Sequence, residues 1–267
     1  MLKADSQRKA WQARFIMAYF SVLRLLARVI LAFVGRVEIS GKENLPPAGP
    51  YITVVNHLSK ADSALVLLAL PKQRIRVFAA NKWRPHPIYG PILSLGGAIF
   101  VKRGQVDRKA LGEAISSLQA GQVLGMAPEG TRSRTRVLQK ARQGAAYIAN
   151  RAQVPVLPIG IANSEKFQDN ILKLRRTHFK VAIGEPFELP DFGRRVRAKE
   201  LSAYSELIMA RIAYLLPQRY HGYYADSLAL AALQDGKDPW PAACQAAGVA
   251  LPITPEQDKS YEPLSPH

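Results

Sequence analysis

The stretch YITVVNHLSKAD, residues 51–62, passes from a strand-like run into polar residues and then into the start of a helix. Its first five residues are aromatic or β-branched types that favour strands. Asp62 then opens a Leu-rich segment that reaches Leu70 and is long enough for a short helix. A strand that leads into a helix is the repeating unit of α/β proteins. This stretch therefore predicts an α/β fold, with His57 on the turn between the two elements.

The same alternation of strand-like and helical runs continues along the chain. Further strands are expected at residues 76–80, 98–102, 123–127, 156–162 and 179–183. Apolar spacing of the helical kind marks segments 111–118, 142–151 and 207–216. We therefore expect one sheet flanked by helices.

The amino-terminal segment is apolar but is interrupted by arginines. Its longest uncharged run, residues 15–23, falls short of the ~20 apolar residues that cross a bilayer, which argues against a simple transmembrane helix and a signal peptide. On a helix, Arg14, Arg24 and Arg28 fall within an arc of about 80°, and apolar residues cover the remainder. We expect segment 1–34 to lie in the lipid headgroup region with its arginines near phosphates. The alternative is a helix packed on the protein's own core.

The charge balance predicts an anionic partner. The chain has 37 Lys and Arg against 20 Asp and Glu, a net charge of +17. Such a charge attracts nucleic acid, anionic lipid or phosphorylated substrates. The lone Cys244 excludes an intramolecular disulfide, and five scattered histidines do not indicate a local zinc site. We expect no metal and no cofactor.

The pair His57 and Asp62 has the residue types of a general-base site. An alcohol is a weak acid, so its attack on a thioester is helped by a base that removes the proton. Neutral imidazole is such a base, and a carboxylate can fix its tautomer. Two simpler interpretations remain: the spacing arises by chance, or Asp62 is a plain helix N-cap.

A second cluster, APEGTRSR at residues 127–134, joins a glycine, hydroxyls and guanidinium groups. Arg132 suits bidentate phosphate binding, and Gly130 lets backbone amides approach the same anion. Thr131 adds a hydroxyl, and we expect Glu129 to orient the arginines rather than to act as a base. The alternative is a solvated basic loop.

A third cluster, GAIFVKRG at residues 97–104, is a strand-like run that ends in Lys102 and Arg103. Arg103 would supply a second contact to a dianionic phosphate. By itself this cluster is also typical of any strand that leaves a core.

In order and spacing, these clusters resemble the glycerolipid acyltransferase family, which includes the bacterial 1-acylglycerol-3-phosphate acyltransferases. They match its N-H-x-x-x-x-D, G-x-I-F-V-x-R and P-E-G-T-R-S blocks, and VPVLPIG at residues 154–160 matches its hydrophobic fourth block. The resemblance covers roughly residues 35–216. Lys102 stands where some members carry an acidic residue and Ala127 where an aromatic is common, which puts substrate preference in doubt more than reaction type.

The resemblance implies an α/β fold whose mixed sheet is flanked by helices and preceded by the amphipathic membrane-interface helix. It implies His57 as general base and Asp62 as its partner. The residues implied around the acceptor's phosphate are Lys102, Arg103, Glu129, Gly130, Thr131 and Arg132. Those implied in the acyl-donor or hydrophobic pocket are Val156 and Pro158.

The implied reaction moves a fatty acyl group from acyl-CoA or acyl carrier protein, as co-substrate, to the hydroxyl of lysophosphatidate. The acceptor can instead be glycerol 3-phosphate, another lysophospholipid or a lyso-amino-acid lipid. The implied location is the cytoplasmic face of the cell membrane, at an anionic lipid surface, peripheral or monotopic. A basic nucleic-acid-binding protein is the alternative from another class, although no groove-entering or stacking motif supports it. A non-catalytic membrane-remodelling protein would leave His57 and Asp62 unexplained.

Three regions follow: the helical segment 1–34, an acyltransferase domain at 35–216 and a Pro-rich extension at 217–267. Prolines are frequent in the extension, so we expect one short helix around residues 226–234 and an extended end. We expect little chemistry there.

Overall fold

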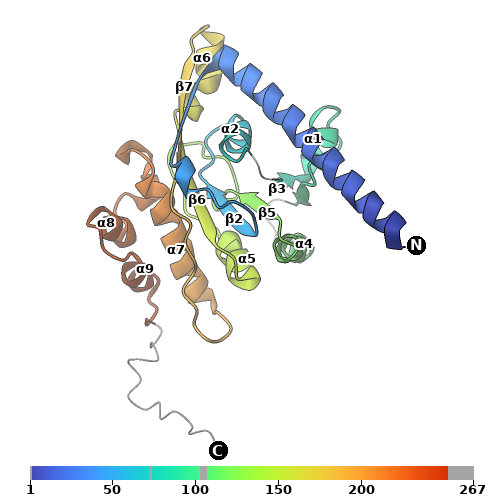
Figure 1. Cartoon of the computed structure of the whole chain (residues 1–267). Coiled ribbons are helices and arrows are strands. Elements are labelled where there is room, and N and C mark those ends of the chain that lie inside the picture. The colour runs from blue at the N-terminus through green and yellow to red at the C-terminus, as the bar shows by residue number, and fades with distance from the viewer. Residues whose placement is uncertain (1, 72–73, 103–106, 252–267) are drawn as a thin grey trace, which may run out of the picture.

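The computed structural model describes residues 2–71, 74–102 and 107–251 and has a seven-stranded mixed sheet within them (Figure 1). The strand order is β1-β7-β6-β2-β5-β3-β4. The strands are β1 (Gly35–Ser40), β2 (Tyr51–Val55), β3 (Ile75–Ala80), β4 (Ile99–Val101), β5 (Val123–Met126), β6 (Val156–Ala162) and β7 (Thr177–Ile183). All neighbouring pairs are parallel except β6 and β7. The predicted mixed α/β sheet is confirmed.

Helices cover both faces of the sheet (Figure 1). One core contains residues of α4, α5, α7, α8 and α9, and the other contains residues of α1 and α2. The helices are α1 (Leu2–Val34), α2 (Asp62–Ala69), α3 (Tyr89–Leu95), α4 (Arg108–Gln119), α5 (Gly144–Ala152), α6 (Phe167–Leu172), α7 (Ala198–Tyr214), α8 (Leu228–Gln234) and α9 (Trp240–Ala247).

The strand directions decide where the predicted motifs meet. Strands β2, β3, β4, β5 and β6 run the same way, so their carboxyl ends share one edge of the sheet. Open α/β sheets bind ligands at such an edge. His57 follows β2 and the 127–134 loop follows β5, the neighbour of β2. The order of the strands therefore places the first two clusters side by side.

Helix α1 is continuous and uses two faces differently. Phe20, Arg24, Ala27 and Leu31 are buried against the domain. Arg24 donates to the backbone oxygen of Leu70 at 3.3 Å. The prediction that all three arginines reach lipid phosphates is therefore wrong for Arg24, because its turn of the helix faces the protein.

The opposite face of α1 is apolar and exposed. Its exposed large side chains are Trp11, Phe15, Met17, Val22, Leu25, Leu26, Val29, Ile30 and Phe33. By length and composition, Arg14–Val34 could cross a membrane, and 22% of its apolar window is buried against the protein. The uncharged-run argument against a span is thus too strict, and these criteria admit both a helix along the membrane and one through it.

The carboxy-terminal extension is part of the folded domain as far as it is described. Helices α8 and α9 both contact α7. Trp240 stacks on Tyr204 with ring centroids 5.4 Å apart, and Cys244 is buried beside them. The expected helix near 226–234 is present as α8, but the prediction of a single helix is wrong, because α9 adds a second. The extended end was predicted for residues that include 252–267, which lie outside the described part.

Candidate active site

The imidazole of His57 and the carboxylate of Asp62 meet, as the sequence predicts. The His57 Nδ1 and Asp62 Oδ2 atoms are 2.8 Å apart. The Asp62 side chain is 2% exposed and that of His57 is 24% exposed. A buried carboxylate therefore holds one side of a ring whose other side reaches the surface.

Backbone amides hold the Asp62 carboxylate in place. Its Oδ2 atom accepts from the amides of Leu58 and Ser59 at 2.7 and 2.8 Å. Asp62 is also the first residue of α2, where the helix dipole favours a negative charge. These bonds compensate the burial of the carboxylate. Asp62 thus organises the turn rather than acting only as a helix cap.

This geometry determines which ring nitrogen of His57 is free. An ionised carboxylate only accepts hydrogen bonds, so Nδ1 carries the proton and Nε2 keeps its lone pair in the neutral ring. Nε2 has no hydrogen-bond partner among the residues that the structure describes. The site can therefore accept a proton from a hydroxyl placed at Nε2.

The second cluster holds the peptide of His57 from both sides. The Glu129 Oε1 atom accepts from the His57 amide at 3.1 Å. The Ser133 amide donates to the His57 carbonyl at 2.7 Å. The sequence clusters at 51–62 and 127–134 are therefore one structural unit.

Glu129 does not have the surroundings expected for it. It is 2% exposed, and its second oxygen accepts from the Gln139 amide at 3.0 Å. We expected it to orient arginines around a phosphate, but both of its oxygens bind backbone amides, so that interpretation is corrected. Burial raises the pKa of Glu129 to about 7, although its two backbone hydrogen bonds act in the opposite direction.

Asn56 is a site residue to which the sequence argument assigned no role. It is fully buried, and its side-chain amide donates to the Ile161 carbonyl at 2.8 Å and accepts from the Ile161 amide at 2.7 Å. It therefore continues the β2–β6 pairing by one residue with its side chain. The sequence feature that could have indicated this role is an Asn directly after a predicted strand.

The loop after Glu129 presents the predicted anion-binding groups. Gly130 has a φ of 71°, in the left-handed region that favours glycine. Arg132 is half-buried and forms no ion pair with a described carboxylate. Thr131 is half-buried next to it. The backbone of Arg132 lies close to the catalytic pair, because the next residue, Ser133, bonds to the His57 peptide.

The third cluster reaches the same edge of the sheet but lies farther along it. Lys102 is exposed directly after β4, the outermost strand, which is separated from β2 by β3 and β5. Arg103 lies outside the described residues. A phosphate contact from either residue stays a prediction.

The fourth block is a sheet strand. Val156 and Pro158 both lie in β6 and are buried. Val156 belongs to the core that includes α5 and α7. Their described surroundings are those of core residues, and a contact with an acyl donor stays a prediction.

Comparisons with known proteins agree with this site. The family model described as "Acyltransferase" matches residues 36–162. The chain is 29% identical to 1-acyl-sn-glycerol-3-phosphate acyltransferase alpha of Bos taurus, over 70% of this chain and 69% of that protein. It is 26% identical to 1-acyl-sn-glycerol-3-phosphate acyltransferase of Bacillus subtilis, over 70% of this chain and 92% of that protein.

A solved structure agrees as well. The crystal structure of the 1-acyl-sn-glycerophosphate (LPA) acyltransferase PlsC from Thermotoga maritima matches with a TM-score of 0.57 and 26% identity, covering 70% of this chain and 75% of that chain. The matched family region contains the His57–Asp62 pair, the Glu129 loop and the fourth block. In its sequence, fold and paired site, the chain resembles the glycerolipid acyltransferase family, and it is an acyltransferase-type enzyme.

Proposed function

We propose that this enzyme transfers a fatty acyl group from a thioester to the free hydroxyl of lysophosphatidate, which produces phosphatidate for phospholipid synthesis. The observation that carries the proposal is the 2.8 Å contact between His57 Nδ1 and Asp62 Oδ2, which leaves Nε2 without a hydrogen-bond partner in the described part of the chain. The names of the similar proteins support the choice of acceptor.

The proposed reaction is a direct transfer. His57 Nε2 removes the proton from the acceptor hydroxyl while the oxygen attacks the thioester carbonyl carbon. The carbon–sulfur bond then breaks, and the thiol leaves with the proton from His57. Asp62 stabilises the imidazolium that forms between these steps. The mechanism needs no metal and no cofactor beyond the thioester co-substrate, which is acyl-CoA or the acylated form of acyl carrier protein.

The acceptor's phosphate would bind to the loop after Glu129. The guanidinium of Arg132, the hydroxyl of Thr131 and the amides near Gly130 are the groups that recognise phosphate. Lys102, directly after β4, would add a second contact, and a contact from Arg103 is proposed from the family resemblance alone. Binding of the phosphate would place the acceptor hydroxyl next to His57 Nε2. The reaction then proceeds between groups that are already positioned, which lowers its entropic barrier.

We further propose that the enzyme is monotopic on the cytoplasmic face of an anionic membrane, with α1 along the surface. One strip of α1, formed by Phe20, Arg24, Ala27 and Leu31, is buried against the domain. Crossing a bilayer requires ~20 apolar residues free of the domain. A helix that lies in the membrane interface can keep its buried strip on the domain while its exposed apolar face contacts lipid.

The test is thiol release by the purified protein. Lysophosphatidate, glycerol 3-phosphate, a lyso-amino-acid lipid and other lysophospholipids are each offered with acyl-CoA and with acyl carrier protein. We expect the highest rate with lysophosphatidate. We expect His57→Ala to lose activity by at least ~100-fold, the typical contribution of a general base, while it stays folded and membrane-bound. Near-normal turnover by His57→Ala would remove the proposed base, and a faster rate with another acceptor would replace lysophosphatidate.

A further inference from the structure

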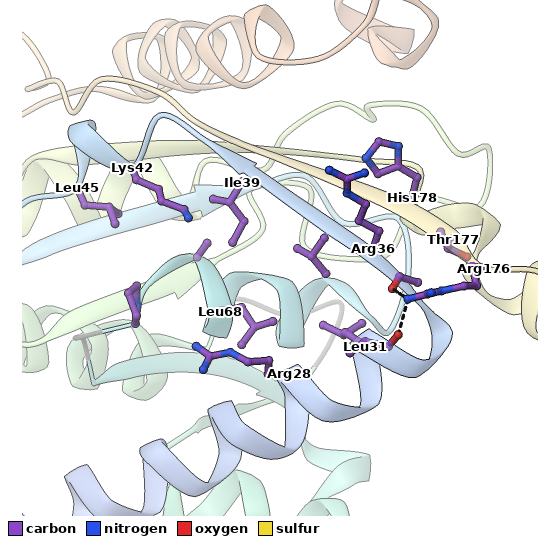
Figure 2. Close-up of a pocket in the computed structure, with 15 residues that line it drawn as sticks. Arg28, Leu31, Arg36, Ile39, Lys42, Leu45, Leu68, Arg176, Thr177 and His178 are labelled. Carbon is purple, nitrogen blue, oxygen red and sulfur yellow. Dashed lines mark hydrogen bonds between the residues drawn. The ribbon is translucent and has the colours of Figure 1, made fainter.

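A groove lies between α1, α2 and β1, outside the four motif blocks (Figure 2). Its volume is about 810 Å³, within the range of roughly 300–1,000 Å³ that is typical of small-molecule sites. The residues of α2 that line it, Leu68 and Ala69, are at the opposite end of the helix from Asp62. A helix of eight residues is roughly 12 Å long, so the groove is separate from the catalytic pair.

Part of the groove lining is apolar. Leu31 of α1, Leu68 of α2 and Leu45 line it, and β1 adds Val37 and Ile39. These two β1 side chains point into the groove because alternate residues of a strand face opposite sides. Hydrocarbon is the chemistry that such walls accept.

Arg28, Arg36 and Lys42 line the same groove as cations without a carboxylate partner among the described residues, and Arg28 and Lys42 lie on opposite sides of it. Figure 2 shows Arg28 on the α1 side and Lys42 on the β1 side. Both side chains are exposed, and neither forms an ion pair with a carboxylate in the described ranges. Arg176 differs, because it donates to the carbonyls of Ala32 and Gly35 at 2.6 and 2.8 Å and so ties α1 to β1.

The groove lies beside the exposed apolar face of α1. Arg28 and Ala32 line the groove, whereas Val29, Ile30 and Phe33 in the same turns are exposed. If α1 lies on a membrane, as proposed above, lipids that contact this face are next to the groove. An occupant with an apolar chain and an anionic head would match both the walls and the cations.

We propose that the groove binds one anionic phospholipid, with an acyl chain among Val37, Ile39 and Leu68 and the phosphate at Arg28 and Lys42. The bound lipid would fasten the carboxyl-terminal half of α1 to the domain. This inference rests on the membrane association of the proposed function but requires no acyl transfer.

The test is native mass spectrometry of the full chain released from nanodiscs of phosphatidylcholine and phosphatidylglycerol. We expect one retained phosphatidylglycerol per chain. The double variant Arg28→Glu/Lys42→Glu should retain it roughly 30-fold more weakly, because each cation near an anionic lipid contributes about a fivefold factor. Leu68→Trp should also expel it by filling the groove.

The matched control is Arg151→Glu/Lys199→Glu, which changes the net charge equally. Both residues are exposed, Arg151 on α5 and Lys199 on α7. These helices pack on the other face of the sheet from α1 and α2, and neither residue lines the groove. This control should retain the lipid, and circular dichroism should show all variants folded.

Four results would overturn the proposal: no retained lipid, retention of phosphatidylcholine as readily, equal losses in the control, or a dimer in place of the lipid. A variant that also stops thiol release with a short-chain soluble acceptor would place the groove in the substrate site instead. Lipid retention is measured in the absence of any reaction. Its outcome therefore tests the groove independently of whether the protein catalyses the proposed acyl transfer.

Discussion

At the scale of single residues, Asp62 and Glu129 are two buried carboxylates that have different roles. Asp62 binds the ring of His57, and Glu129 binds its backbone amide. One carboxylate therefore orients the reacting group, while the other places the peptide that carries it. Removing the first should alter proton transfer, and removing the second should alter the geometry of the loop.

Arg132 tests whether the loop after Glu129 recognises phosphate. We expect Arg132→Ala to raise the KM for a phosphorylated acceptor by roughly tenfold or more, because a charge-assisted hydrogen bond contributes about 1.5–3 kcal/mol. The KM for the acyl donor should change little. Arg132→Lys should recover part of the effect by restoring charge without the planar fork. Steady-state kinetics with each substrate varied in turn would measure this, and equal changes for donor and acceptor would count against a phosphate contact.

Glu129 predicts a pH dependence of stability. Burial raises its pKa from 4.5 to about 7, so between these values the folded protein binds more protons than the unfolded chain. The free energy of unfolding should therefore fall as the pH rises through this window, by up to ~3 kcal/mol. Glu129→Gln removes this titration and one acceptor.

Urea unfolding between about pH 5 and about pH 8 measures the effect. The decrease in the free energy of unfolding should be smaller in Glu129→Gln than in the wild type. Identical pH slopes in the two proteins would show that Glu129 does not titrate in this range.

At the scale of elements, α1 combines a strip packed on the domain with an exposed apolar face. Leu26 and Phe33 are 52% and 81% exposed on that face. We expect Leu26→Asp/Phe33→Asp to weaken binding to anionic vesicles by at least ~100-fold, because each large apolar side chain transferred from water contributes about 1.5–3 kcal/mol.

Vesicle co-sedimentation measures this binding. The control Tyr214→Asp/Leu228→Asp changes two exposed side chains of α7 and α8, which pack on the other face of the sheet, and should bind as the wild type does. Equal losses in both variants would mean that added negative charge, rather than the α1 face, explains the result.

At the scale of the whole molecule, the described part of the chain after residue 217, residues 218–251, completes the core. Trp240 is 7% exposed and contacts Tyr204 and Phe192. We expect Trp240→Ala to lower the free energy of unfolding by about 3–5 kcal/mol, the usual cost of deleting a large buried aromatic. Chemical denaturation measures the loss. Lys237→Ala, at an exposed position nearby, is the control, and wild-type stability of Trp240→Ala would indicate a loosely attached segment.

The whole fold also shows which elements are readable along the chain. Strands β2 and β6 are buried along their full length and stand out as continuous apolar runs, so their bounds were predicted without error. Strand β1 was missed, because its alternation with Arg36 and Glu38 is short and half-exposed. Helix α9 was missed because the prolines around it are typical of extended chain.

The sequence by itself determined the α/β class, the pairing of His57 with Asp62 and the apolar character of α1, because each depends on residues close together in the chain. The tertiary structure alone decided that Glu129 and Ser133 hold the peptide of His57, and that Asn56 bonds to Ile161. Those contacts join residues some 70 to 105 positions apart, and only the order of β5, β2 and β6 in the sheet brings them within hydrogen-bond distance.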